Sequence, residues 1–222
     1  MMDYSSFVYQ AGLVDNKVAA RMKVFEVHCD AALAANDWEL AFRFFGATLG
    51  TFIEAAESIS VYNYVYEESG SSLYGPFTKF IQRPEVKKAL HVGSNKFGNL
   101  NTVYTKLIGD FMTSAKPWLE ELLEHYRIMS YSGQMDIICA YPLSARTFRN
   151  LQWSGSSDYH DADRKPWYLQ KTLAGYVKKA GNLQEVMVRN AGHMVPTDQP
   201  VRSLQLLEAF INNEPLKGEP HD

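Results

Sequence analysis

The sequence has few of the residues and runs that mark several common classes of protein. It holds two cysteines in 222 residues, Cys29 and Cys139, too few for a disulfide scaffold or a four-cysteine metal site. No uninterrupted apolar run approaches the roughly 18 residues of a membrane-spanning helix. Basic residues number 22 against 25 acidic ones. This net charge of −3 gives no electrostatic reason to expect nucleic acid or an anionic membrane as a partner.

Signals for export and for cofactor binding are missing as well. The first residues, Met1 to Tyr4, lack the basic flank and apolar core of a signal peptide, so the chain read literally is cytoplasmic. There is no Asn-x-Ser/Thr glycosylation sequon and no Gly-rich phosphate loop of either standard spacing. The 6 histidines show no His-x-x-x-His spacing and no Cys-x-x-Cys pair occurs, so the sequence predicts neither a cofactor nor a metal.

What is present is a globular composition, with 46% hydrophobic and 13% aromatic residues. Residues 15–57 carry apolar positions at three- to four-residue spacing, which predicts two amphipathic helices with no strand between them. We expect Asn36 and Glu39 to form a capping box that begins the second helix. Residues 58–75 are first rich in β-formers and then in Gly and Ser, which indicates a boundary between two parts of the chain.

The rest of the chain alternates between helical and extended patterns. We expect irregular structure over 91–113, a polar loop over 153–163 and a frayed tail over 212–222. Alternation of this kind is typical of an α/β architecture in which crossover helices join parallel strands. The predicted helices are 84–90, 116–125, 142–150 and 201–211, the predicted strands are 127–131 and 184–189, and 168–180 has mixed character.

Two polar residues follow the predicted strands in positions that suit catalysis. Asp136 lies just past a Gly turn after the strand at 127–131, and His193 lies in a Gly-flanked turn after the strand at 184–189. α/β hydrolases present their general base on such a turn, and an acid fixes the tautomer of the base and stabilises its charged form. The separation of 57 positions, 193 minus 136, and the order match the last two members of a Ser…Asp…His chain.

These residues also have structural interpretations. An Asp after a Gly turn often serves as a turn or cap residue, and a lone His after Gly can be structural. Cys139 could approach the site, or it could be a small buried apolar side chain. No nucleophile elbow is recognisable, because Gly70–Gly75 and Trp153–Ser157 both lack the Gly-x-Ser-x-Gly spacing. From the residues alone, a catalytic dyad and a structural pair both stay open.

Six segments carry a more specific pattern. They are Tyr4–Asp15, Pro84–Val92, Lys116–Leu119, Gly133–Cys139, Ala174–Lys178 and Ala191–Pro200. Together they resemble the serine carboxypeptidases (peptidase family S10), and within them the vitellogenic carboxypeptidase-like branch. The resemblance covers essentially residues 4–212, is most specific in its last block, and is to the C-terminal half of these proteins.

The resemblance implies part of an α/β-hydrolase fold with a helical cap inserted before the last core strands. Residues 1–14 would be a core-proximal segment, 15–75 the helical cap, 76–212 the C-terminal part of the core and 213–222 a tail. It implies release of single residues from peptide C-termini, usually under acidic conditions, in the lysosome or the secretory route. No cofactor is implied.

The resemblance also assigns roles at the site. By motif match, Asp136 is the acid of the catalytic triad and His193 its base. Cys139 matches a free cysteine that many members carry near the site, and Met194 lines the site beside the histidine. Tyr176 is implied to be a structural neighbour of the site that takes no part in the chemistry.

The same resemblance implies that the nucleophile does not lie in the part of the family fold that this chain resembles. In this family the nucleophile sits in a Gly-Glu-Ser-Tyr-Ala-Gly-type elbow in the N-terminal half, which also supplies most of the oxyanion hole and the grip on the substrate carboxylate. We therefore expect no hydrolysis by this chain alone. Three hypotheses stay open: an inactive fragment, an enzyme half that needs an N-terminal chain, and a non-catalytic binding or regulatory module. An uncovered sheet edge and apolar face would invite self-association or a partner.

Overall fold

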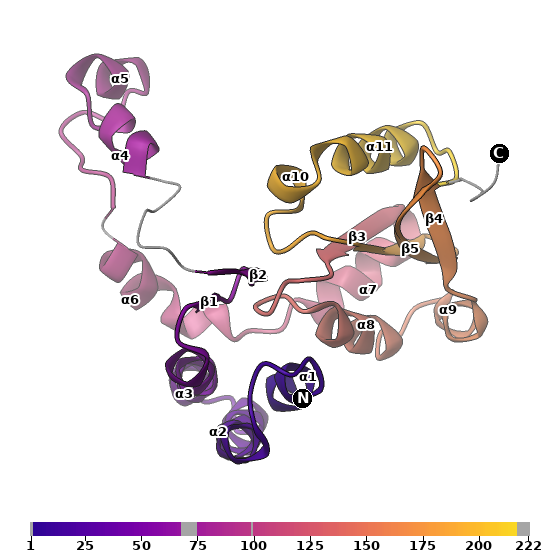
Figure 1. Cartoon of the computed structure of the whole chain (residues 1–222), viewed down its shortest axis with the longest axis horizontal. Helices are drawn as coiled ribbons and strands as arrows, with labels where there is room; N and C mark the ends of the chain where they lie inside the picture. Colours follow the sequence, from indigo (N-terminus) through magenta and orange to yellow (C-terminus); the bar gives the residue numbers. More distant parts are fainter. Residues whose placement is uncertain (1, 68–74, 99, 217–222) are drawn as a thin grey trace.

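A computed structural model describes residues 2–67, 75–98 and 100–216, in which a helical part lies beside an α/β part (Figure 1). The helices are α1 Tyr4–Gln10, α2 Asn16–Ala34, α3 Trp38–Ala56, α4 Gly75–Ile81, α5 Pro84–Ala89, α6 Leu100–Phe111, α7 Lys116–His125, α8 Tyr141–Arg149, α9 Ser156–Asp161, α10 Val195–Asp198 and α11 Pro200–Ile211. The strands are β1 Ile59–Ser60, β2 Asn63–Glu67, β3 Ile128–Gly133, β4 Lys165–Leu169, β5 Thr172–Ala180 and β6 Leu183–Val188. None of the described helices is both long and apolar enough to cross a bilayer.

The helical part is built on α2 and α3, the two helices that the periodicity over 15–57 predicts. Their shared face buries Met22 and Cys29 from α2 and Phe52 from α3. The short helix α1 is fixed to α2 by a buried carboxylate, because Glu26 accepts hydrogen bonds from the backbone N–H and the hydroxyl of Ser5 at 2.7 and 2.8 Å. A buried carboxylate is tolerated only when it is paired in this way.

The turn between α2 and α3 corrects the predicted capping box. Asn36 has a φ of 57°, and it ends α2 in the left-handed conformation that Asn tolerates at this position. The N-cap of α3 is Asp37, whose side chain accepts the N–H of Leu40 at 3.0 Å. The predicted N-cap is wrong by one residue. Asn and Asp both suit a helix boundary, and only the backbone conformation separates their roles.

The α/β part contains a four-stranded sheet of order β3-β6-β5-β4. β3 and β6 are parallel, as predicted, but β5 runs antiparallel to both β6 and β4. The expectation of parallel strands joined by crossover helices is therefore wrong for β5, and the segment of mixed character divides between β4 and β5. The cause is the two-residue connection Gly181-Asn182, a hairpin turn that admits no crossover helix.

Helices cover both faces of this sheet. In Figure 1, α10 and α11 lie on one face, while α7 and α8 lie on the other. Leu206 of α11 is buried against Trp167 and Val186, and Leu123 of α7 is buried against Leu183 and Phe148. This is the layered α/β arrangement that the alternating pattern predicts.

Most of the remaining local predictions are confirmed. The helices predicted at 84–90, 116–125, 142–150 and 201–211 correspond to α5, α7, α8 and α11, and the two predicted strands to β3 and β6. Two expectations are wrong: α6 occupies much of 91–113, and α9 interrupts the loop over 153–163. The polar composition of this segment suggested a loop. It forms the short helix α9 because Tyr159 is buried and holds it against the core. The Gly/Ser stretch of the predicted boundary (68–74) and the end of the tail (217–222) lie outside the described residues.

Candidate active site

The two loops that follow β3 and β6 form the framework of the site. Gly133 and Val188 are paired at the ends of these neighbouring parallel strands, so the loops emerge side by side. A Cβ at Gly133 would lie 2.1 Å from the carbonyl oxygen of Gly192, so a side chain there would force the two loops apart. The backbone N–H of Met135 donates to the carbonyl of Ala191 at 2.8 Å and ties the loops directly.

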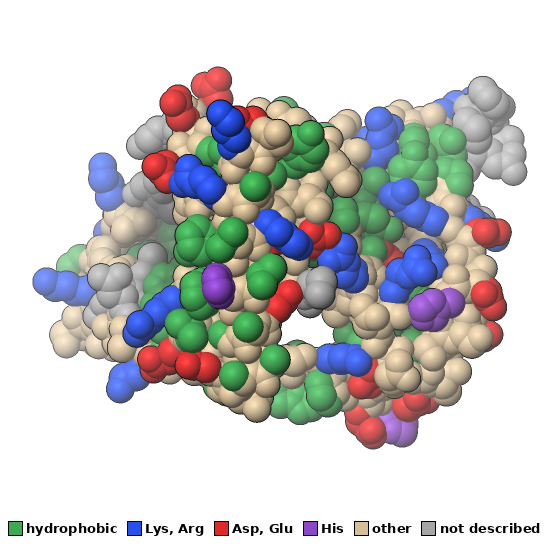
Figure 2. All heavy atoms as spheres, turned by 90° about the horizontal axis from the view of Figure 1, so that it is seen from below, with side chains coloured by type: hydrophobic (Ala, Val, Ile, Leu, Met, Phe, Trp, Pro, Cys, Tyr) green, Lys and Arg blue, Asp and Glu red, His purple; other side chains and the backbone are tan. Residues whose placement is uncertain are grey.

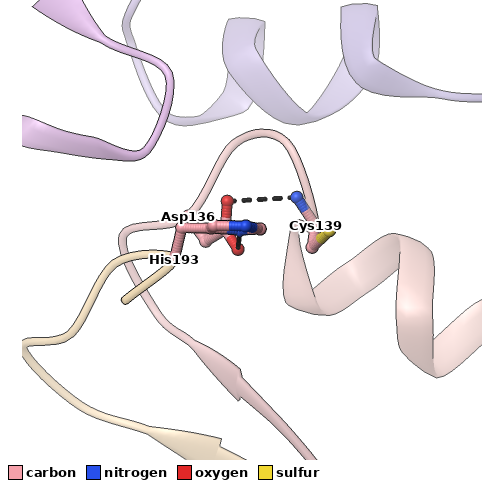
Figure 3. A group of neighbouring side chains, drawn as sticks. All are labelled: Asp136, Cys139 and His193. Carbon is pink, nitrogen blue, oxygen red and sulfur yellow. Dashed lines mark hydrogen bonds and ion pairs between the residues drawn. The ribbon is translucent and has the colours of Figure 1, made fainter. Parts of the chain in front are cut away.

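This framework brings Asp136 and His193 together. The Nδ1 atom of His193 lies 2.9 Å from Oδ2 of Asp136, and the second carboxylate oxygen accepts the backbone N–H of Cys139 at 3.0 Å (Figure 3). Asp136 is 2% exposed, whereas the side chain of His193 is 33% exposed. Because an ionised carboxylate can only accept, the bond requires the proton on Nδ1 and leaves the Nε2 lone pair free to take a proton. No described residue hydrogen-bonds to Nε2.

Cys139 lies beside this pair and is exposed, so the interpretation of a small buried side chain is wrong. Desolvation raises the pKa of its thiol, and the negative charge of Asp136 adds to this effect. Donor atoms of Asp136, Cys139 and His193 lie within 4.8 Å of one another, although no standard metal-ligand spacing in the sequence predicts this grouping. Both carboxylate oxygens are already engaged within the protein, which favours an acid–base pair with a neighbouring thiol over a metal site.

A segment of the helical part braces the loop that carries His193. Residues 61–64, called here the bracing segment, comprise the turn between β1 and β2 and the first two residues of β2. The carbonyl of Tyr62 accepts the backbone N–H of His193 at 2.6 Å, and the two rings lie 5.4 Å apart between centroids. Gly192 is required for this approach, since a Cβ there would lie 2.2 Å from the same carbonyl oxygen.

The bracing segment also holds the loop that carries the acid. The backbone N–H of Tyr64 donates to the carbonyl of Met135 at 3.0 Å, and the N–H of Ile137 donates to the carbonyl of Val61 at 3.1 Å. These bonds lie immediately before and after Asp136. One short segment therefore fixes the backbone on which both members of the pair stand.

A second carboxylate completes the brace. Oδ2 of Asp198 accepts the backbone N–H of Gly192 at 2.6 Å and the side-chain amide of Asn63 at 2.9 Å. Asn63 is buried, so its amide depends on this partner. No sequence pattern assigns a role to Tyr62, Asn63 or Asp198. The only local signal was an Asp in the short helix α10 that follows the histidine.

The two other residues predicted near the site are Met194 and Tyr176. Met194 follows His193 as the N-cap of α10 and is about half exposed. Tyr176 on β5 stacks on the guanidinium of Arg164, with the Arg164 carbon 4.1 Å from the ring centroid. Arg164 in turn lies over Tyr141, two positions past Cys139. In the described part of the chain, no hydrogen bond or ring contact joins Tyr176 to the pair itself.

The fold and the pair together define an α/β hydrolase architecture, present in part. Comparison with known proteins agrees: residues 4–213 match the family model described as serine carboxypeptidase. The chain is 35% identical to the venom serine carboxypeptidase of Apis mellifera, over 96% of this chain and 48% of that protein. It is 34% identical to the vitellogenic carboxypeptidase of Aedes aegypti, over 97% of this chain and 48% of that protein.

The fold has a counterpart among solved structures. Kex1(delta)p, a prohormone-processing carboxypeptidase from Saccharomyces cerevisiae, superposes with a TM-score of 0.72 at 23% identity, over 95% of this chain and 52% of that one. The chain belongs to the serine carboxypeptidase family, and the expected fold class and family are confirmed. It spans about half the length of the curated relatives it matches.

Replacement of Asp198 tests the brace. We expect Asp198→Ala to lower the free energy of unfolding by about 2–3 kcal/mol, because it leaves the Gly192 N–H and the buried Asn63 amide without their acceptor. Thr197→Ala, an exposed neighbour in the same helix, should change it by less than about 0.5 kcal/mol. Urea denaturation gives both values. Equal effects of the two substitutions would contradict the brace.

Replacement of Asp136 tests the orientation of the base. We expect the neutral ring of His193 to carry its proton on Nδ1, and Asp136→Asn to shift the proton towards Nε2, because the substituted amide no longer selects a donor at Nδ1. Nitrogen NMR of the histidine rings measures the tautomer. Cys139→Ser serves as the control and should leave it unchanged. An unaltered tautomer in Asp136→Asn would show that the carboxylate does not orient the ring.

Proposed function

We propose that this chain provides the acid and the base of a serine-type carboxypeptidase, and that the nucleophile comes from the part of the family fold that the chain does not span. One observation carries the proposal: Asp136 bonds Nδ1 of His193 at 2.9 Å and leaves Nε2 without a partner among the described residues. This is the arrangement in which a histidine accepts the proton of an attacking hydroxyl.

The chemistry of each residue follows from this geometry. Nε2 of His193 takes the proton of a serine hydroxyl as that oxygen attacks the last peptide carbonyl of a substrate. It then gives the proton to the nitrogen of the departing C-terminal residue. Asp136 stabilises the imidazolium that exists between these two transfers. A serine and an oxyanion hole must be brought to Nε2 for either step to occur.

Cys139 does not replace the missing serine. It is the thiol beside the pair, but its raised pKa keeps it protonated at neutral pH, and the thiolate is the reactive form. Its backbone N–H, which bonds Asp136, gives it a place in holding the acid. A cysteine-type hydrolase is therefore not favoured.

The substrate class and compartment follow from the relatives. The curated relatives are named carboxypeptidases, one of them from venom, and these names support the C-termini of peptides as substrate. We propose the lysosome or the secretory route as the compartment and no cofactor.

Activity of the isolated chain is the direct test. Purified residues 1–222 should not hydrolyse an N-blocked dipeptide above the uncatalysed rate, because a base without a nucleophile and an oxyanion hole has no reaction to accelerate. Release of the C-terminal amino acid is measured by amine detection, with His193→Ala as the control. Hydrolysis that is present in the chain and lost in His193→Ala would overturn the requirement for a further part.

The state of the chain in solution separates an enzyme half from an independent binding module. Large apolar side chains are exposed on several helices, among them Trp118, Leu207 and Ile211. Such surfaces favour association, so we expect the chain to self-associate or to need detergent for solubility. Sedimentation velocity over a concentration series measures this. A monodisperse monomer that melts cooperatively would instead support a self-sufficient binding or regulatory module.

A further inference from the structure

One peptide unit links the acid of the pair to the helical part. Its N–H, that of Cys139, donates to Oδ1 of Asp136 at 3.0 Å (Figure 3). Its carbonyl, that of Ile138, accepts the hydroxyl of Tyr4 at 2.7 Å. The C=O and the N–H of a trans peptide unit lie in one plane and point in opposite directions. A bond that fixes the carbonyl therefore also fixes the direction of the N–H that holds the carboxylate.

The bracing segment holds this loop from its other side. The carbonyl of Val61 accepts the backbone N–H groups of Ile137 and Ile138 at 3.1 and 3.3 Å. These bonds leave the carbonyl of Ile138 unused, and among the described residues the hydroxyl of Tyr4 is the donor that reaches it. The peptide unit next to the acid thus depends on Tyr4 for its orientation.

The hydroxyl of Tyr4 is suited to act as a permanent donor. Tyr4 is 7% exposed, and its ring packs edge to face with that of Phe45, with the centroids 6.2 Å apart. Burial raises the pKa of the hydroxyl, and the nearby Cys139 and Asp136 add to this effect. The hydroxyl therefore keeps its proton throughout the physiological range of pH. A buried phenol also needs a partner, because it has no access to water.

Two anchors fix α1, the helix that carries this tyrosine. On the side of α2, Ser5 donates both its backbone N–H and its hydroxyl to Glu26, a carboxylate that is 1% exposed. On the side of α8, Asp3 pairs with Arg146 at 2.6 Å. Since α8 begins directly after the loop that carries the acid, α1 is held between the helical part and the helix into which that loop leads.

We propose that Tyr4 is a positioning residue of the catalytic pair, which orients Asp136 through the peptide unit between Ile138 and Cys139, an inference that rests on the proposed function. The hydrogen bonds form a series from the Tyr4 hydroxyl through the peptide unit to the carboxylate, and from there to the ring of His193. Bonds in such a series polarise and strengthen one another. In the described part of the chain, no hydrogen bond or ring contact joins Tyr4 to His193, so its effect on the base passes through the acid.

Tyr4→Phe removes the hydroxyl and keeps the ring in the core. Without its donor, the peptide unit turns more freely, and the carboxylate selects the proton on Nδ1 less strictly. We expect the amide hydrogen of Cys139 to exchange at least about tenfold faster. We also expect the Nε2–H fraction of the neutral His193 ring to rise about threefold or more. Hydrogen exchange under native conditions and nitrogen NMR of the histidine rings measure the two effects.

Tyr159→Phe is the matched control, because it also removes one hydroxyl from a buried tyrosine. Tyr159 is 1% exposed and donates to the carboxylate of Glu185, and no hydrogen bond or ring contact joins it to residues 136–139 in the described structure. Its acceptor is charged, so its loss should lower the midpoint of thermal unfolding at least as much as Tyr4→Phe does. Neither the exchange of the Cys139 amide nor the tautomer of His193 should change.

Two variants of Glu26 test the anchor of α1. Glu26→Gln keeps an acceptor for the N–H of Ser5 and offers a donor to its hydroxyl oxygen, so both measurements should match those of the unsubstituted chain. Glu26→Ala removes the anchor and should reproduce the changes of Tyr4→Phe. Where Glu26→Ala does not fold, the comparison of Tyr4→Phe with Tyr159→Phe decides the question.

The role of Tyr4 is supported when Tyr4→Phe changes both measurements and Tyr159→Phe changes neither. Unaltered exchange and tautomer in Tyr4→Phe would overturn it and leave Tyr4 as a core residue only. Equal changes in the two variants would also overturn it, because they would reflect a general loosening of the fold. Neither measurement requires hydrolysis. Hydrolysis by residues 1–222 that is lost in His193→Ala would refute the proposed function and leave the role of Tyr4 intact.

Discussion

The bond from the His193 N–H to the carbonyl of Tyr62 is the contact on which the candidate site depends. It joins the base to the helical part, and the neighbouring carbonyl of Val61 holds the acid loop in the same way. The two parts also meet at α1, where the hydroxyl of Tyr4 donates to the carbonyl of Ile138 at 2.7 Å and Arg146 pairs with Asp3 at 2.6 Å. Figure 2 shows an opening between them when the molecule is viewed from below. The geometry of the pair is therefore set jointly by the sheet, which supplies the loops, and by the bracing segment, which fixes their backbones.

Local pattern was sufficient to predict the elements on which the pair stands. A Gly turn after an apolar run is visible in the sequence, and it correctly indicated where Asp136 and His193 follow β3 and β6. The hairpin of β5 and β6 was also encoded locally, in Gly181-Asn182, but the mixed composition of 168–180 obscured β5, the strand before the turn. That two-residue turn is what makes β5 antiparallel to β6, so the direction of β5 could be predicted only by recognising the turn.

The brace could not have been predicted in the same way. Asn63 and Asp198 are separated by 135 positions, and their bond exists only because the helical part folds back over the end of the sheet. Neither residue lies in a motif whose spacing implies the other. Tyr62 contributes chiefly through its carbonyl oxygen, a group that every residue carries, so the identity of the side chain gives no signal for that contact.

The open edge of the sheet and the acid of the pair belong to the same strand, β3, and the base follows the neighbouring strand β6. β3 leads into the turn that carries Asp136, and among the described residues its outer side pairs with no strand and Nε2 of His193 has no hydrogen-bond partner. A nucleophile that uses this base has to reach the two loops at the carboxyl ends of β3 and β6, where the acid and the base stand.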